Sequence, residues 1–196
     1  MKILVIADQI SPVLYDYFNE ERFQEVDLVI SCGDLPADYL EFIVSMLNVP
    51  CFYVPGNHDT GFMENPPPGW IALDDTLIDH KGICILGLGG SMRYKPGPYQ
   101  YSEFEMKGRV LRLKPKIWLK KKKIDILVTH APAYELGDIQ DSPHRGFKVF
   151  RKFLDTYQPK YFLHGHVHLN YTGQPRRMTY GKTNIINGFE HYLFDF

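Results

Sequence analysis

The chain has 196 residues, a length that suits one domain, and its composition excludes several classes of protein. Hydrophobic residues make up 44% and charged residues 23%, which is typical of a globular protein with an ample core. The formal net charge of −1 argues against a general attraction to nucleic acid or anionic membranes, and no apolar run approaches the roughly 20 residues of a membrane helix.

The amino terminus and the cysteines predict a cytoplasmic protein. The first residues pass directly into an apolar run, without a signal-peptide pattern. Cys32, Cys51 and Cys84 are an odd number, and none belongs to a CxxC pair. Reduced thiols in the core are the simplest interpretation, and a thiolate metal site is the alternative.

The predicted secondary structure alternates between strands and helices. Apolar runs of the kind that form strands covered on both faces lie at 2–8, 27–34, 51–59, 124–130 and 160–168. Helices are expected from Ser11-Pro12 to about Phe18, over 36–47, from a capping box at Ser102 and Glu105 to a kink or end at Pro115, and over 143–157.

Two segments depart from this alternation. Residues 76–90 resemble two strands around a Lys81-Gly82 turn, and the end of the chain, from Tyr171 to Phe196, contains further short strands. The pattern predicts an α/β fold in which antiparallel strands extend a parallel core. We expect a single domain over residues 1–196, since no linker divides the chain.

Polar side chains follow each of the five apolar runs. Because ligands bind at the carboxyl ends of strands in open α/β sheets, we expect these side chains to converge. One such residue could be a turn former or a surface histidine, but five strand ends with residues of this type are hard to explain in that way. The set is Asp8, Asp34, Asn57, His58, His130, His166 and His168.

The donor atoms of this set indicate a transition-metal site. Carboxylate and amide oxygens with imidazoles, and no thiolate, suit Mn, Fe, Zn or Ni. His166 and His168 flank one residue, so their rings lie on the same side of an extended chain. Gly33, Gly56 and Gly165 each precede a candidate ligand, which lets the backbone turn and approach closely.

The order and spacing of these motifs resemble the calcineurin-like metallophosphoesterases. The resemblance rests on Asp8, Gly33-Asp34, the GNHD motif at 56–59, Thr129-His130 and the GHVH motif at 165–168, and it spans nearly the whole chain. It implies a four-layer β-sandwich of mixed sheets flanked by helices, with two metal ions at one edge. The chain looks like a compact prokaryotic member of the phosphodiesterase type.

Residue roles follow from the resemblance by position. It implies that Asp34 bridges both metals, that Asn57, His130 and His166 complete the second site, and that Asp8 and His168 serve the first. It also implies that the catalytic residue His58 lies beside the substrate, where Asp59 orients its ring. The reaction would be hydrolysis of a phosphomonoester or phosphodiester at two divalent transition metals.

The first motif departs from the family pattern. Family members usually begin Asp-x-His, whereas this chain has Asp8-Gln9-Ile10, so the first site lacks an imidazole and is expected to be weak or selective. Ile10 also fits a hydrophobic staple with Tyr15 at the start of the predicted helix. The amide oxygen of Gln9 is a poor substitute, since a strand would point it away from Asp8.

Two loops supply candidate substrate-binding residues. Arg93, in a loop rich in tyrosine, could hold a phosphate with its guanidinium, and His144 precedes a predicted helix whose amino terminus favours an anion. A surface role is the alternative for each. The basic run at 119–123 fits a solvated helix end better than a nucleic-acid site.

Two functional hypotheses follow. The first is a metal-dependent phosphoesterase, with phosphodiesterase activity favoured, that acts on a small phosphoester or nucleotide. The second is a catalytically weakened nucleotide-binding or scaffold protein that keeps the fold and one metal, as Ile10 suggests. No large nucleic acid and no membrane are expected as partners, and self-association as a homo-oligomer is left open. The missing HExxH motif argues against a metallopeptidase.

Overall fold

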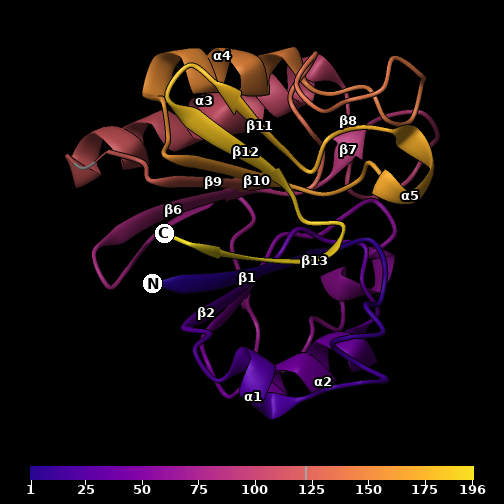
Figure 1. Cartoon of the computed structure of the whole chain (residues 1–196). Helices are drawn as coiled ribbons and strands as arrows, with labels where there is room; N and C mark the ends of the chain where they lie inside the picture. The colour runs from indigo at the N-terminus through magenta and orange to yellow at the C-terminus, as the bar shows by residue number, and fades with distance from the viewer. Residues whose placement is uncertain (122) are drawn as a thin grey trace.

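The computed structural model describes residues 1–121 and 123–196, and its main feature is a pair of facing β-sheets (Figure 1). The first sheet has the strand order β13-β1-β2-β3-β4. Strands β1 to β4 run parallel, and the C-terminal strand β13 pairs antiparallel with β1. Their bounds are Lys2–Ala7 for β1, Leu28–Ser31 for β2, Cys51–Tyr53 for β3, Ile71–Ala72 for β4 and Glu190–Asp195 for β13.

The second sheet has the order β11-β12-β10-β9-β6-β5. Its four central strands are parallel, and β5 and β11 close the two edges in antiparallel pairing. The bounds are Thr76–His80 for β5, Ile83–Leu88 for β6, Ile126–Thr129 for β9, Tyr161–His164 for β10, Arg177–Tyr180 for β11 and Thr183–Asn187 for β12. The short strands β7 (Ser91–Met92) and β8 (Gln100–Tyr101) form a separate pair.

Helices cover the outer face of each sheet, which gives four layers (Figure 1). Helices α1 (Glu20–Phe23) and α2 (Ala37–Leu47) pack on the first sheet, and α3 (Glu103–Lys120) and α4 (Lys148–Tyr157) pack on the second. A 3₁₀ turn η1 (Thr60–Met63) and the short α5 (Leu169–Thr172) lie in connections. The predicted four-layer sandwich of mixed sheets is confirmed.

The two sheets bury a common apolar core between them. Strands covered on both faces need continuous apolar sequence, and this is why the five runs do not alternate with polar residues. The buried side chains that face each other in this layer include Ile3, Val5, Ile30, Ile85, Ile126, Val128, Leu163 and Ile186. All three cysteines are buried thiols, in agreement with the prediction that they lie in the core.

The helix predicted from Ser11 to Phe18 is wrong. The segment forms turns, in which Leu14 and Tyr15 donate to the Ser11 carbonyl, and the first α-helix begins at Glu20. The Ser11 hydroxyl lies 2.7 Å from Nδ1 of His191, on the C-terminal strand, so it does not cap a helix. A partner distant in sequence therefore overrode the local capping signal.

The remaining helices agree with the sequence except at their ends. Ser102 and Glu105 form the expected capping box, but α3 continues through Pro115 to Lys120, so Pro115 does not end it. Helix α4 begins at Lys148, so residues 143–147 form a loop, not a helix. The prediction of a helix amino terminus directly after His144 is therefore wrong. In the basic run at 119–123, Lys121 caps α3, and Lys122 lies outside the described residues.

Candidate metal centre

The predicted metal ligands converge at one edge of the sandwich. They follow the carboxyl ends of parallel strands from both sheets, where such ends come together. The edge contains a cavity of about 290 Å³. The side chains that line it are Asp8, Asp34, Asn57, His58, Tyr94, Pro143, His144, His166 and His168.

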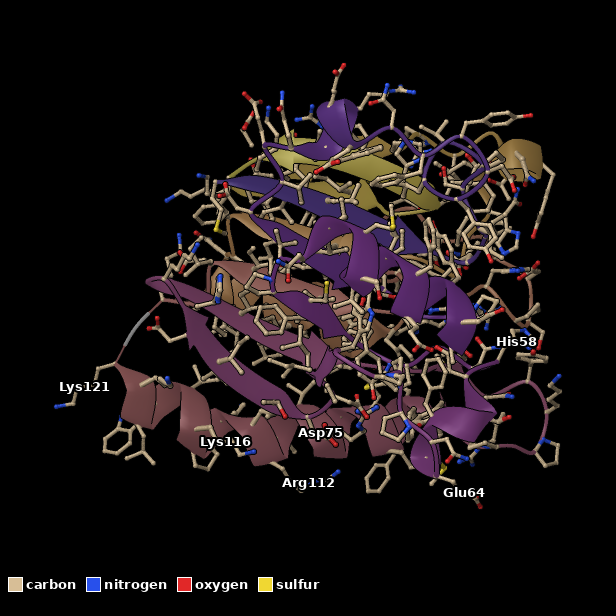
Figure 2. All side chains as sticks on the ribbon, turned by 90° about the horizontal axis from the view of Figure 1, so that it is seen from below. His58, Glu64, Asp75, Arg112, Lys116 and Lys121 are labelled. Atoms are coloured by element: carbon tan, nitrogen blue, oxygen red, sulfur yellow. The ribbon has the colours of Figure 1, made fainter. Side chains whose placement is uncertain are left out.

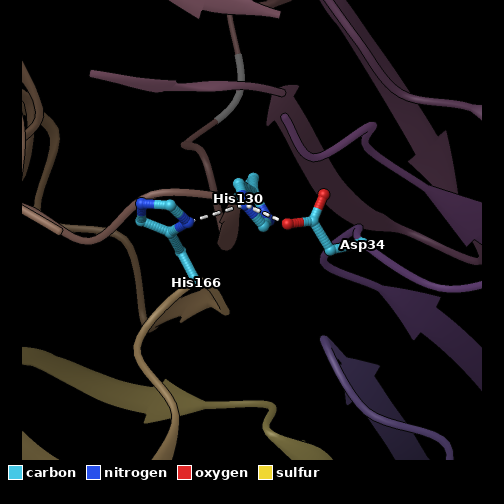
Figure 3. Close-up of side chains that lie close together, drawn as sticks. All are labelled: Asp34, His130 and His166. Atoms are coloured by element: carbon cyan, nitrogen blue, oxygen red, sulfur yellow. Dashed lines mark hydrogen bonds and ion pairs between the residues drawn. The ribbon is translucent and has the colours of Figure 1, made fainter. Parts of the chain in front are cut away.

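The tightest cluster comprises Asp34, His130 and His166 (Figure 3). Among the residues that the structure describes, their ligand atoms lie within 4.8 Å of one another. Nε2 of His130 lies at the centre, 3.0 Å from Nδ1 of His166 and 3.3 Å from Oδ2 of Asp34. Oδ1 of Asn57 lies 3.1 Å from the same nitrogen. These are the four side chains that the resemblance assigns to the second metal site.

Hydrogen bonds to backbone carbonyls fix the tautomers of the two imidazoles. Nδ1 of His130 lies 2.8 Å from the Cys32 carbonyl oxygen, and Nε2 of His166 lies 2.7 Å from the Pro143 carbonyl oxygen. Because a carbonyl only accepts, these two nitrogens carry the protons. In the neutral imidazoles, the nitrogens that face the cluster are then both acceptors.

The cluster therefore presents only acceptor atoms at its centre. Two imidazole nitrogens, an amide oxygen and a carboxylate oxygen meet in a buried place, which is unfavourable unless a cation lies among them. Nitrogen and oxygen donors without thiolate fit Mn, Fe, Zn or Ni. The residues at this position thus fit a divalent transition metal.

The pKa values in the protein without metal reflect the same need for positive charge. Burial disfavours the His130 imidazolium, but the charge of Asp34 and a hydrogen bond to it outweigh burial and raise the pKa of His130 to about 9. Burial opposes ionisation of Asp34 as well, yet His130 and the backbone N–H of His58 lower the pKa of Asp34 to about 2. A proton on His130 therefore substitutes for a cation.

The residues predicted to form the first metal site, Asp8 and His168, are partly exposed. Both oxygens of Asp8 accept the backbone N–H of His166 at 2.9 Å, and His168 lines the same cavity. Gln9 donates to Glu190, 3.3 Å away, and does not line the cavity. Ile10 is partly buried against the core beneath α1 and α2, but the hydrophobic staple predicted with Tyr15 is wrong, because no helix begins at Ser11.

Three of the proposed ligands have left-handed backbone conformations. The φ angles are 66° for Asp8, 58° for Asp34 and 68° for His166. A non-glycine residue seldom adopts such an angle, and strained positions of this kind cluster at functional sites. The backbone turns at these residues, shortly after strands β1, β2 and β10 end, and this aims the side chains at the cavity.

Glycines allow the strand ends to approach one another as predicted. A Cβ atom at Gly56 would lie 2.0 Å from Oδ1 of Asp34, and one at Gly165 would lie 2.7 Å from Oδ2 of Asp8. Only glycine avoids these overlaps. The two positions explain why a glycine stands directly before Asn57 and before His166.

Asp59 joins two of the ligand loops. Oδ2 of its buried carboxylate accepts the backbone N–H groups of Asp34 and Gly56, each at 2.8 Å. His58 is exposed in the cavity wall, and its backbone N–H donates to Oδ1 of Asp34 at 2.7 Å. Among the hydrogen bonds of the described residues, those of Asp59 go to backbone groups, and its role toward the His58 ring stays a prediction.

The two predicted substrate-binding residues lie in different places. Arg93 points to Glu105 at the start of α3, 2.8 Å away, and does not line the cavity. His144 lines the cavity, and its ring centroid lies 5.2 Å from that of His166. Asp141, whose carboxylate holds His144, was not among the predicted site residues, although an Asp three residues before a His in a loop can signal such a contact.

In the presence of a chelator, the protein should become more stable as the pH falls from 8 to 6. Burial, and then the charge of Asp34, raises the pKa of Asp8 and of Asp59 to about 7. Since the folded pKa exceeds the unfolded value near 4, the cost of ionising these carboxyls is complete above pH 7 and disappears toward pH 4. Charged His130, with its pKa raised to about 9, likewise stabilises the fold below that pH.

Thermal unfolding at pH 6 and pH 8 measures this effect. Asp8→Asn should raise the melting temperature at pH 8 by about 2–4 °C for each kcal/mol of relieved cost. Asp16→Asn, at an exposed position, is the control and should change little. A melting temperature that rises with pH in the chelated wild type would contradict the prediction.

The sequence matches the calcineurin-like phosphoesterase family over residues 1–170. The chain belongs to this family. The match includes every proposed metal ligand, and a comparison with curated proteins finds no further match. Family members are in general phosphoesterases that bind divalent metals, which agrees with the acceptor cluster at Asp34, His130 and His166.

Solved structures share the fold of this family member at low sequence identity. One crystal structure has a TM-score of 0.73 and 16% identity, and the match covers 99% of this chain and 94% of the other. The crystal structure of TT1561 from Thermus thermophilus has a TM-score of 0.66 and 15% identity, with 96% and 89% covered. GAP50, described as the anchor in the inner membrane complex of Plasmodium, has a TM-score of 0.58 and 14% identity, with 95% and 70% covered.

Within residues 1–121 and 123–196, no helix has both the length and the apolar character that a membrane-spanning segment requires.

Proposed function

We propose that the protein is a metal-dependent phosphoesterase that uses two divalent transition metals and favours phosphodiesters. The observation that carries the proposal is the buried meeting of four acceptor atoms from Asp34, Asn57, His130 and His166. Asp8 and His168, across the same cavity, would hold the first metal. The family to which the chain belongs supports the reaction class.

The protein's own contribution to the reaction is to position the metals and the substrate and to balance their charge. The chemistry that paired divalent cations supply is Lewis-acid activation of water and neutralisation of the phosphoryl group. Asp34 would bridge the sites, since its carboxylate lies beside His130 and accepts the backbone N–H of His58. Asp59 holds the loops of Asp34 and Gly56 together by accepting a backbone N–H from each.

His58 would act on the substrate and not on the metal. Its exposed side chain lies in the cavity wall, whereas the second-site ligands are buried or nearly so. An imidazole there can donate a proton to the leaving oxygen or stabilise the transition state. The substrate would be a small phosphoester or nucleotide, since a cavity of about 290 Å³ is near the lower end of the range for small-molecule sites. Phosphate binding by Arg93, which lies outside the cavity wall and pairs with Glu105, and a cytoplasmic location remain predictions from the sequence.

Turnover of bis(p-nitrophenyl) phosphate with Mn tests the proposal. The wild type should hydrolyse it, His166→Ala should lose both metal and turnover, and His58→Ala should lose about 100-fold or more in turnover while it keeps the metal. Lys95→Ala, on an exposed loop outside the cavity wall, is the matched control. Equal activity of the wild type and His166→Ala on all phosphoesters tried would refute the proposal.

A second candidate is a nucleotide-binding or scaffold protein with little turnover. The observation that favours it is Ile10, which packs into the core and cannot bind metal. The second metal site would then serve ligand binding alone. Calorimetry with nucleotides distinguishes the two candidates, because tight binding without hydrolysis under Mn, Fe, Zn or Ni would support the second.

A further inference from the structure

The first metal site, as the sequence defines it, lacks one imidazole. We infer that His144 supplies this ligand, so that the first metal is held by Asp8, Asp34, His168 and His144. The inference rests on the proposed metal-dependent function and adds to it a ligand from a different loop. It replaces the role in substrate binding that the sequence suggested for His144.

His144 lies in the wall of the cavity that would hold the first metal. It lines the same cavity as Asp8 and His168, and its side chain is only 21% exposed. Its ring is 5.2 Å from the ring of His166, centroid to centroid. An imidazole from this loop can therefore reach the cavity from which Ile10 has turned away to pack beneath α1 and α2.

Asp141 holds His144 in the manner typical of a metal ligand. Its Oδ2 lies 2.8 Å and its Oδ1 3.0 Å from Nδ1 of His144, and Oδ1 also accepts the His144 backbone N–H at 2.8 Å. A carboxylate on one ring nitrogen fixes the proton there and leaves Nε2 as the basic nitrogen. No hydrogen bond from the described residues engages Nε2 of His144.

The loop that carries His144 is tied to the second metal site. The Pro143 carbonyl accepts from Nε2 of His166, at 2.7 Å, so adjacent residues orient a second-site ligand and present His144. The buried carboxylate of Asp138 accepts the Gly146 N–H at 2.9 Å, which anchors the other side of the loop. The loop of His144 is thus held by a hydrogen bond to His166 and by another to Asp138, whereas a loop at the protein surface often lacks such contacts.

A surface ion pair is the competing interpretation of Asp141 and His144. The Asp141 side chain is 46% exposed, and an exposed pair of this kind contributes little to stability. That interpretation explains the contact between the two residues. It does not explain why the imidazole lines the cavity beside Asp8 and His168, where this chain lacks the nitrogen ligand of the family pattern.

Metal stoichiometry in a set of four proteins tests the inference. Wild type, Ile10→His, His144→Ala and the double variant are titrated with Mn by calorimetry, and bound Mn is counted by elemental analysis. The wild type should bind two ions, and His144→Ala should bind the weaker one at least about 10-fold less tightly. The double variant should recover this affinity, since Ile10→His restores an imidazole.

One further measurement and two further variants keep the test independent of how well the variants fold. Pulsed electron paramagnetic resonance of the Mn-loaded protein should show one fewer coupled nitrogen in His144→Ala than in wild type. Arg145→Ala, at the next and exposed position of the loop, should behave as wild type in both measurements. Asp141→Asn should weaken the binding of the same Mn ion by about 10-fold, because the ligating histidine loses its hydrogen-bond partner.

The outcomes separate the inference from the proposed function. Unchanged Mn binding and nitrogen coupling in His144→Ala would overturn the inference, and a raised KM with unchanged Mn binding would assign His144 to the substrate instead. If the wild type binds two ions and either of these outcomes is found for His144→Ala, the proposed function stands without the inference. A wild type that binds no Mn, Fe, Zn or Ni would overturn both.

Discussion

Asp34→Asn should abolish binding of both metals and lower phosphodiester turnover by more than about 100-fold. Loss of a residue that only hydrogen-bonds to a metal ligand costs up to about 100-fold, and loss of a bridging ligand should cost more. The carboxylate lies 3.3 Å from Nε2 of His130 and is the proposed bridge between the sites. Asparagine keeps the size of the side chain and tolerates the φ of 58° at this position. The effect should therefore come from lost charge and not from a distorted loop.

Calorimetric titration with Mn, and turnover of bis(p-nitrophenyl) phosphate, measure this effect. Asp16→Asn removes an exposed carboxylate that does not line the cavity and serves as the control. Circular dichroism should show the same fold in both variants. The proposed bridge would be wrong if Asp34→Asn kept two ions with wild-type affinity.

Arg109→Met should destabilise the protein by about 2–4 kcal/mol, because it removes a buried guanidinium that pairs with two partly exposed carboxylates and satisfies a backbone carbonyl. The Arg109 side chain is only 4% exposed and forms an ion pair with Asp74. Its Nε lies 3.0 Å from Oδ1 of Asp75, and its Nη1 donates to the Gly89 carbonyl at 2.7 Å. The guanidinium also stacks on Tyr101, 4.4 Å from the ring centroid.

The melting temperature should fall by about 4–16 °C for a chain of this size. Arg112→Met, one turn further along α3 on its outer face (Figure 2), is the matched control and should stay within about 0.5 kcal/mol of wild type. Metal stoichiometry at low temperature should not change, since Arg109 does not line the cavity. A loss below about 1 kcal/mol would show that the ion pair is dispensable.

Arg109 illustrates what the sequence could not predict. It lies in an amphipathic helix with cations on both sides, where an arginine normally points to solvent. Its burial depends on Asp74 and Asp75, which precede β5 and are 34 or 35 positions away. No local pattern reveals such a pairing, since it exists only when α3 packs against the second sheet.

An α/β fold and the convergence of the ligand-type residues could be predicted from the residues alone, whereas the four-layer sandwich and the assignment of ligands to a second metal site came from the family resemblance. Parallel strands buried on both faces need continuous apolar runs, and the carboxyl ends of such strands meet at one edge. Asp34, Asn57, His130 and His166 could therefore be grouped across more than 100 positions, and the structure brings their acceptor atoms together.

Other details depend on contacts between distant segments, and these appear only in the folded protein. The Cys32 and Pro143 carbonyls set the tautomers of the two histidines, and His191 takes the Ser11 hydroxyl that seemed to cap a helix. The loop before α4 turns His144 into the cavity, whereas a longer helix was expected there. Each of these outcomes is a competition between a local propensity and a partner far along the chain, and only the tertiary packing places that partner within reach.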